Sequence, residues 1–431
     1  MNTTTIISTW EAIIQQFIPV FTTPTAQIFM NLLTGWVLCT AKRTITGILP
    51  FADPKANKAH DAYHRFFPNA SWVISDLWQR LIILLVKVFY PVGTIVTDLD
   101  DTLFHRTGRK VNGADWWRDA VRSTATKVVH AWGLNLVIVT LRIHPPWGGE
   151  PIGLPINIRL HRKDGPSLID LAEQMLTEIA LWLPERRFLC HCDGFYASLA
   201  GREILATGIV SRMRRDASIY ALPPKKRKKQ RGRPRKRGSR LLCPEQMAKR
   251  VKNWQQVDTI ERGKKRKRLV CARKVIWYKV SERPVLLVIS RDPEGKEKDD
   301  FFFTTDLSLS AAQVIGGFAG RWSIEDTIKN TKQFLGGQEP QTYKGKGPER
   351  AAALSLWLYS VVWLWYLQQK RVRKLMVPLP WYPAKARPSF QDALACLRRA
   401  LWRQRIKSMF VKRFVHNKNF EFLIEALAHA A

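Results

Sequence analysis

Four short apolar runs between residues 92 and 194 constrain the fold of this chain more than any other feature. They read GTIVTDLDD after Val92, LNLVIVTLRI at 134–143, LPINIRLHR at 154–162 and RFLCHCDG at 187–194. Each has strand length and is rich in branched apolar residues, whereas the segment from Ser167 to Leu183 has helical periodicity. The order of three strands, a helix and a fourth strand predicts an α/β domain with a mixed sheet.

The chain carries a large excess of positive charge. Seventy Lys and Arg stand against thirty-five Asp and Glu, which gives a formal net charge of +35. Such an excess goes far beyond what solubility requires. Strongly basic proteins usually bind phosphate groups, so nucleic acid is the expected partner. An anionic membrane surface or an RNA particle is the weaker interpretation, because 17 Trp and 20 Phe indicate a large folded protein.

Two basic blocks, PPKKRKKQRGRPRKRGSR at 223–240 and ERGKKRKR at 261–268, lie among β-rich segments. They predict an inserted, strand-rich subdomain over 211–308 that faces DNA. Its GRPR core, Gly232 to Arg235, resembles an AT-hook, an extended arm that places arginines in a narrow minor groove. A flexible basic loop explains the same residues equally well, and both interpretations stay open.

Helical patterns fill the two ends of the chain. The first ninety residues predict a helical unit that either binds DNA ends or caps the next domain. The run AAALSLWLYSVVWLWYL at 351–367 barely reaches spanning length, so a buried helix is expected and no membrane partner. Residues 1–41 contain no Lys or Arg and the six cysteines show no CxxC spacing, which favours the cytoplasm over export.

Acidic residues end two of the apolar runs. Asp193 ends the fourth, and Asp98, Asp100 and Asp101 crowd the end of the first. Strand ends of one sheet share a crevice, and hard oxygen ligands from separate elements are what two-metal phosphodiester cleavage needs. Such a dense carboxylate cluster also repels itself without a cation. We expect Asp101 and Asp193 to be metal ligands, with Asp100 as the second choice for the first acid.

A third acid lies in FAGRWSIEDTIKNTK at 318–332. On a helix with 100° per residue, Arg321, Glu325 and Lys332 fall within about 40° of one another, so one face carries an acid between two bases. The simpler interpretation is a surface salt bridge between Arg321 and Glu325 at i,i+4.

The spacing R-x3-E-x6-K, with DDTLFHRTGRK, CDGFYAS, VSRMRRDA and LGGQEPQTY, resembles the DDE transposases of bacterial insertion sequences. The similarity runs from about residue 40 to about residue 370. It points to the clade whose RNase H-like fold carries a β-strand insertion before its Glu. The family signature is Y-x2-R-x3-E-x6-K, and Phe318 stands here in place of the Tyr. Phe keeps the ring and loses the hydroxyl, which removes any phosphate contact from that position.

The resemblance implies an RNase H-like catalytic domain in two parts, 91–210 and 309–370. A helical DNA-binding domain (1–90) would precede it and a basic helical region (371–431) would follow. Two Mg²⁺ ions, or Mn²⁺, would be held by Asp101, Asp193 and Glu325. A homodimer near the bacterial nucleoid would cut DNA at terminal inverted repeats and transfer the 3′-hydroxyl end to target DNA.

The candidate DNA contacts are Arg321, Lys332, Arg212, Arg214, Arg215, Arg233, Arg235, Lys236 and Trp254. Trp254 could stack on an extruded base, although core packing is the simpler role.

Two other functions remain open. VTDLDDTL also matches the D-x-D-x-T loop of haloacid dehalogenase phosphatases, with Asp98 as nucleophile, Asp100 as acid/base, and Asp299 and Asp300 completing a magnesium site. That interpretation leaves the charge of +35 without a purpose. A DNA-binding transposase descendant that has lost catalysis is the third possibility.

Overall fold

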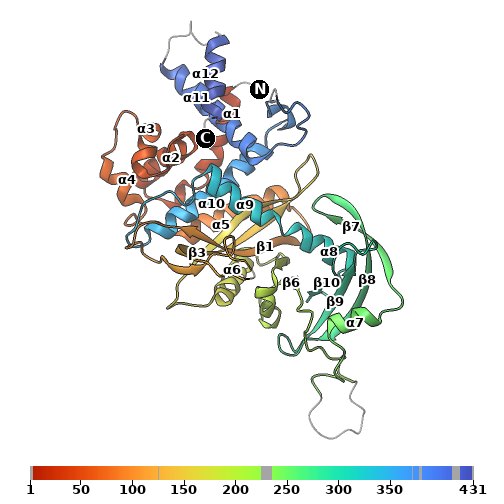
Figure 1. Cartoon of the computed structure of the whole chain (residues 1–431). Coiled ribbons are helices and arrows are strands. Elements are labelled where there is room, and N and C mark those ends of the chain that lie inside the picture. The colour runs from red at the N-terminus through yellow and green to blue at the C-terminus, as the bar shows by residue number, and fades with distance from the viewer. Residues whose placement is uncertain are drawn as a thin grey trace.

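The computed structural model describes residues 3–124, 126–224, 235–370, 372–377, 381–409 and 418–429. Its centre is a ten-stranded mixed sheet in the order β2-β3-β1-β5-β6-β10-β9-β8-β7, with β4 paired to β3 (Figure 1). The strands are β1 (Ile95–His105), β2 (Asp115–Arg118), β3 (His130–Ile143), β4 (Ile152–His161), β5 (Phe188–Cys192), β6 (Thr207–Arg212), β7 (Gln255–Glu261), β8 (Lys264–Ile276), β9 (Pro284–Arg291) and β10 (Asp300–Thr304).

The first part of the sheet has the RNase H-like arrangement. β3 pairs antiparallel with both β1 and β4, whereas β1, β5 and β6 pair in parallel. In the order β4-β3-β1-β5-β6, therefore, only β3 runs against the others. The predicted α/β class and the predicted order of strands are confirmed. The short strand β2 was not predicted, because its segment DWWR has no apolar alternation.

The predicted β-rich insertion is a continuation of the same sheet. β10 pairs with β6, and β9, β8 and β7 follow in antiparallel order. Leu287, Ile289 and Phe303 of these strands, with Trp277 just after β8, belong to a hydrophobic cluster separate from the main core. The insertion is thus joined to the first part of the sheet by the backbone ladder and has a core of its own.

Helices cover the sheet and build the N- and C-terminal regions (Figure 1). They are α1 (Thr3–Gln15), α2 (Thr23–Leu38), α3 (Ile45–Ala52), α4 (His60–Phe66), α5 (Ile74–Phe89), α6 (Leu168–Trp182), α7 (Pro244–Arg250), α8 (Ala311–Gly320), α9 (Ser323–Phe334), α10 (Gly347–Leu367), α11 (Phe390–Met409) and α12 (Lys418–His429), with short 3-10 turns η1 (Ile18–Val20), η2 (Gly194–Gly201) and η3 (Val372–Leu375).

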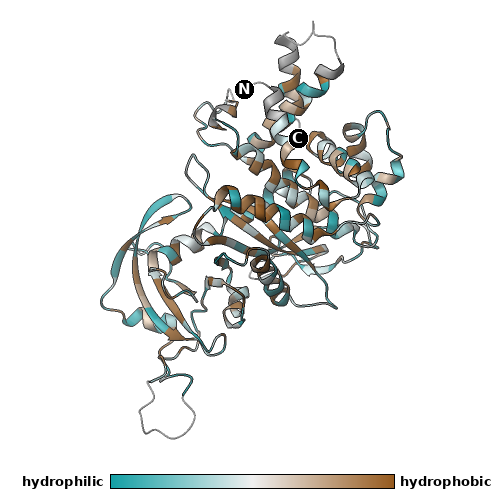
Figure 2. Cartoon of the chain, turned by 180° about the vertical axis from the view of Figure 1, so that it is seen from behind, coloured by the Kyte–Doolittle hydropathy of each residue, from teal (hydrophilic) through white to brown (hydrophobic). Residues whose placement is uncertain are grey.

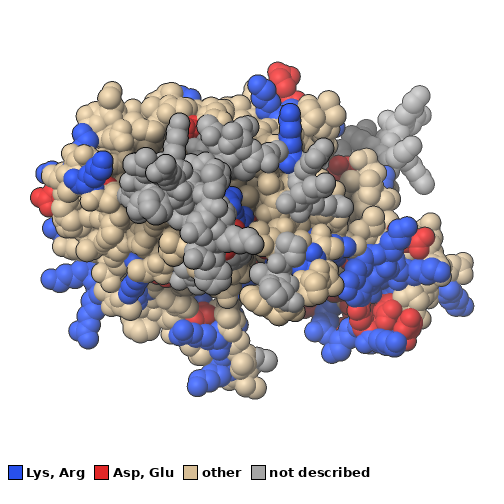
Figure 3. Space-filling view, turned by 90° about the horizontal axis from the view of Figure 1, so that it is seen from above, with Lys and Arg blue, Asp and Glu red and all other residues tan. Residues whose placement is uncertain are grey.

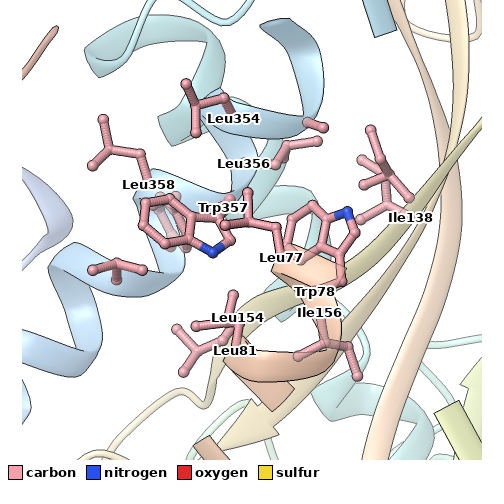
Figure 4. Close-up of a cluster of buried hydrophobic side chains, with 14 of the residues drawn as sticks. Leu77, Trp78, Leu81, Ile138, Leu154, Ile156, Leu354, Leu356, Trp357 and Leu358 are labelled. Carbon is pink, nitrogen blue, oxygen red and sulfur yellow. The ribbon is translucent and has the colours of Figure 1, made fainter. Parts of the chain in front are cut away.

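α10 is the central helix of the main core. It is apolar on every side and buried along nearly its whole length, as a helix without a polar face must be. Figure 2 shows hydrophobic segments gathered where the helices meet the sheet, and Figure 4 shows Trp357 of α10 among side chains from α5 and the sheet. The predicted buried helix at 351–367 is confirmed. Within the described ranges, every helix is too short or too polar to span a bilayer.

Trp357 tests how far the fold depends on α10. Its ring is fully buried and lies 4.8 Å from the ring of Phe17 and 5.6 Å from that of Phe29. We expect Trp357→Ala to lower the free energy of unfolding by about 3–5 kcal/mol, because it leaves a large cavity. The control is Trp381→Ala at a side chain that is 80% exposed, which should change little. Urea denaturation measures both, and equal effects would contradict a core centred on α10.

Candidate active site

The three acids of β1 point to two different faces of the sheet. Asp98 and Asp100 face α9, where they accept hydrogen bonds from Ser323 Oγ (3.1 Å) and Arg321 Nη1 (2.6 Å) respectively. Asp101 faces the other way and accepts a hydrogen bond from the hydroxyl of Tyr196 in η2 at 2.9 Å. The alternation of side chains along a strand therefore separates Asp101 from the Glu325 helix and directs Asp100 toward it.

Asp98 belongs to a buried ion pair. It is fully buried and bonds to the guanidinium of Arg142 on β3, whose Nη1 also donates to the carbonyl of Gly317 in α8 at 2.7 Å. A sealed, paired carboxylate cannot attack a phosphate ester. Asp299 and Asp300, the acids needed for the magnesium site of a phosphatase, pair instead with arginines of β9 and β6. The phosphatase interpretation is therefore wrong.

The segment 318–332 is two helices and not one. α8 begins at a capping box formed by Ser310 and Gln313 and ends at Gly320, and α9 begins after a turn. Arg321, in that turn, still reaches Glu325 Oε1 at 3.3 Å, so the predicted contact between them is confirmed. Lys332 does not join them, because its Nζ donates to Thr102 Oγ1 (3.0 Å) and to the carbonyl of Leu103 (2.9 Å) on β1.

Asp193 lies beside Asp100. In the parallel pairing of β1 with β5 the last matched residues are Leu99 and Cys192, so the next residue on each strand is an aspartate. The side chain of Asp193 caps η2 by accepting from the backbone N–H of Phe195 at 2.9 Å. It also lines a cleft of about 540 Å³ that the insertion and α8 close from the other side.

The electrostatics link Asp100 to both other acids. Burial raises the pKa of Asp100, Arg321 lowers it in part, and Asp193 raises it again. The pKa of Glu325 is also raised by burial, with Arg321 lowering it and Asp100 raising it. Burial, followed by the charges of Asp100 and Asp193, raises the pKa of Asp101 to about 6, and the hydrogen bond from Tyr196 lowers it in part. Negative charge is thus concentrated around Asp100, and Arg321 only partly neutralises it.

The acids are chemically suited to a hard divalent cation, because they offer carboxylate oxygens in a site short of positive charge. Arg321 nevertheless holds a place between Asp100 and Glu325. Among the residues that the structure describes, no three His, Cys, Asp or Glu side chains converge closely enough to hold a metal ion together. A shared ion would require Arg321 to leave its present position.

The predicted DNA contacts are spread around the cleft and the insertion. Arg212 and Arg321 line the cleft, and both guanidinium groups lie over the ring of Phe318, at 5.3 and 5.6 Å. Arg214 pairs with Asp216, Lys236 pairs with Glu282, and Arg215 and Arg235 are exposed. Trp254 packs under Arg291 and against the insertion core, as the simpler interpretation expected. Arg233 lies outside the described residues.

Exposed lysines and arginines of β8, at 264–267, add to this surface. Figure 3 shows Lys and Arg side chains crowded together on the right of the view, with acidic side chains between them.

Sequence reasoning missed two residues of the site. Arg142 is a charged residue inside the apolar strand LVIVTLRI, a pattern that signals a buried partner. Tyr196 follows Asp193 by three residues in the turn η2 and holds Asp101 from there. For Arg142 the signal was present, whereas for Tyr196 only the fold brings the partners together.

Comparison with known proteins assigns the chain to a family. The model of a family described as DDE superfamily endonuclease matches residues 16–284. Because the match spans more than half of the chain, the chain belongs to the DDE superfamily endonuclease family. The matched segment includes Asp100, Asp101 and Asp193, and it ends before α8 and α9. The resemblance to DDE enzymes is confirmed at the level of this family, which supports an endonuclease activity.

No curated protein matches the chain. Among solved structures, a piggyBac transposase synaptic complex with hairpin DNA is similar, at 9% sequence identity and a TM-score of 0.39. The alignment covers 93% of this chain and 76% of that chain. A similarity of this size carries no argument about function.

Arg142 provides a test of the buried pair. Arg142→Met leaves the buried Asp98 without its charged partner, with the hydroxyl of Ser323 as its remaining donor, so we expect the free energy of unfolding to fall by about 3–5 kcal/mol. Arg214→Met, which breaks an exposed pair with Asp216, is the control and should leave stability unchanged. Chemical denaturation at neutral pH compares the two. If the two variants were equally stable, Asp98 would not depend on Arg142.

Asp101 provides a test by pH. Its pKa is about 6 in the folded chain, against about 3.9 in an unfolded one, so folding favours the protonated form. As pH rises through this range the wild type loses stability, and the loss is complete above about pH 6. We therefore expect Asp101→Asn to raise the urea midpoint at about pH 7.5 and to leave it nearly unchanged at about pH 4.

The control for this pH dependence is Asp216→Asn. Asp216 is an exposed acid whose pKa is lowered by its ion pair with Arg214, so this substitution should change the urea midpoint little at either pH value. A gain in the urea midpoint from Asp101→Asn of the same size at both pH values would mean that folding does not raise the pKa of Asp101.

Proposed function

We propose that this chain cleaves DNA phosphodiester bonds with the help of a divalent metal ion and acts as a transposase. The observation that carries the proposal is that Arg321 bridges Asp100 and Glu325, while Asp193 follows the strand position beside Asp100 in an RNase H-like sheet. Membership of the DDE superfamily endonuclease family supports the class of reaction. The strong positive charge and the arginine-lined cleft supply a surface for the DNA backbone.

Within this proposal Asp100 takes the place that the sequence assigned first to Asp101. Asp100 accepts a hydrogen bond from Arg321, as Glu325 does. It also lies beside Asp193, because the residues just before them, Leu99 and Cys192, are paired in the sheet. Asp101 instead holds Tyr196 on the opposite face. The assignment of Asp101 stays a prediction, and the contacts of β1 favour Asp100.

Mg²⁺, or Mn²⁺ in its place, would be held by Asp100 and Asp193, with Glu325 as a further ligand. When bound, the ion would lower the pKa of an attacking water and neutralise the leaving oxygen. The chain's own part is to orient the DNA. Arg212 and Arg321 lie where phosphate oxygens entering the cleft could accept hydrogen bonds, and Phe318 supports both guanidinium groups.

The finer parts of the function extend this proposal. Cleavage at terminal inverted repeats, transfer of the 3′-hydroxyl end to target DNA and assembly as a homodimer follow from the resemblance to insertion-sequence transposases. They would be tested by joining of a labelled end to plasmid DNA and by the mass of the protein–DNA complex.

Cleavage of labelled duplexes taken from the DNA flanking the gene tests the proposal. We expect strand cleavage in Mg²⁺ that falls by on the order of 10³-fold or more in Asp100→Asn, Asp193→Asn and Glu325→Gln, since each removes an anionic ligand. Asp326→Asn, a half-buried acid beside Glu325, is the matched control and should stay near wild type. Asp101→Asn should cost no more than about tenfold, because its carboxylate faces away from Glu325.

The outcomes separate the remaining interpretations. Full loss in Asp101→Asn with activity kept in Asp100→Asn would move the first acid back to Asp101. A wild-type protein that binds the duplex and never cleaves it, in Mg²⁺ or Mn²⁺, would identify a DNA-binding descendant without catalysis.

A further inference from the structure

A second hollow lies at the end of β1, beyond the carboxylates. Its volume is about 420 Å³, and it is lined by Lys42, by residues 105–111 after β1 and by residues 338–343 after α9. We call it the β1-end pocket. His105 lies five residues after Asp100 on β1, which at about 3.3 Å per residue places the pocket roughly 17 Å from Asp100. None of its lining residues belongs to the proposed catalytic set.

The β1-end pocket is strongly positive. Lys42, Arg109 and Lys110 are exposed at its wall. Among its lining residues, all of them described, Glu339 is the one acid, and it accepts hydrogen bonds from the backbone N–H of Arg43 at 2.7 Å. The carboxylate of Glu339 is thereby already engaged outside the pocket, and its charge leaves most of the positive charge unbalanced.

Arg106 has unused donors within this wall. It is only 8% exposed, and its Nη1 donates to the carbonyls of Gln338 and Pro340. Its Nε and Nη2 have no hydrogen-bond partner. Buried donors without partners cost free energy, and the two nitrogens along one edge of a guanidinium match two oxygens of a phosphate. The pKa of Arg106, lowered by burial to about 10, leaves it charged at neutral pH.

His105 completes the arrangement. Its Nε2 lies 2.9 Å from Asp119 Oδ2, and Asp119 is buried, so the ring is fixed in orientation at the pocket wall. The pocket therefore combines an oriented imidazole, a buried guanidinium with unpaired donors, and exposed cations in its wall. Such a set suits one tetrahedral dianion or phosphodiester.

We propose that the β1-end pocket binds one backbone phosphate of the DNA that the active site cleaves, and this rests on the proposed function. At about 3.4 Å per base pair, roughly 17 Å corresponds to about five base pairs from the scissile bond. Contacts of this kind set the register of the duplex and read no sequence. A free phosphate ion offers the same oxygens; the net charge of +35 and the shared strand β1 favour DNA.

Salt-dependent binding of a mixed-sequence duplex of about 30 base pairs, followed by fluorescence anisotropy without divalent metal, tests the pocket. Arg109→Gln/Lys110→Gln should weaken binding several-fold at about 0.1 M KCl and reduce the slope of log Kd against log salt by about 1. The control, Lys87→Gln/Lys127→Gln, removes the same charge from exposed sites outside the pocket and should reduce the slope less. Arg106→Lys keeps the positive charge but removes the pair of donors Nε and Nη2, so it should also weaken DNA binding. Its melting temperature shows whether the variant is folded.

A second arm uses inorganic phosphate at constant ionic strength. In one outcome, phosphate raises the melting temperature of the wild type but not that of Arg109→Gln/Lys110→Gln, and the two double variants bind DNA with equal affinity. The pocket would then bind free phosphate, and the assignment to DNA would be overturned. Equal loss of slope in the two double variants would also overturn it, since it would show only general attraction. If the slope of log Kd against log salt fell only in the pocket variant, but the protein never cleaved DNA, the catalytic proposal would be contradicted. The proposal that the pocket binds DNA would be supported.

Discussion

The buried pair of Asp98 and Arg142 is the constraint on which the site depends. A carboxylate sealed in a protein core is tolerated only with a charged and hydrogen-bonded partner, and Arg142 supplies both. The same guanidinium bonds to the carbonyl of Gly317, and Ser323 bonds to Asp98. A Cβ at Gly320 would come within 2.7 Å of Arg142 Nη1, so a side chain at this position would push the guanidinium away from Asp98. The turn between α8 and α9 is thereby fixed over β1.

The positions of Arg321 and Glu325 over β1 follow from that attachment. Arg321 lies in the fixed turn and meets Asp100, and Glu325 follows one helical turn later. On the opposite side, the hairpin of β7 and β8 reaches the same turn, where Arg262 stacks on Trp322 at 4.0 Å. The insertion thus contacts the turn between α8 and α9 as well as pairing with β6. Arg321 of that turn pairs with both Asp100 and Glu325.

The strands and the class of the fold could be predicted from the sequence, because their apolar periodicity is local. The central helix was also readable, since a run such as 351–367 without charge must be buried. Which face each acid takes could not be settled by spacing to the next Thr. Strand alternation alone places Asp98 and Asp100 on one face of the sheet. That this is the face covered by Arg321 and α9 could be learned only from the fold. The helix break at Arg321 escaped prediction because no Gly-Pro or Asn-Gly signal marks it, and the contact of Lys332 with β1 depends on that break.

The location of a divalent ion in a complex of this protein with DNA tests the central claim most directly. Anomalous scattering from Mn²⁺ in crystals of that complex would locate the ion without reference to activity. We predict a peak ligated by Asp100 and Asp193, with Arg321 moved from between Asp100 and Glu325 and Asp101 still bonded to Tyr196. A peak ligated by Asp101, or no peak at any of the three carboxylates, would contradict the account.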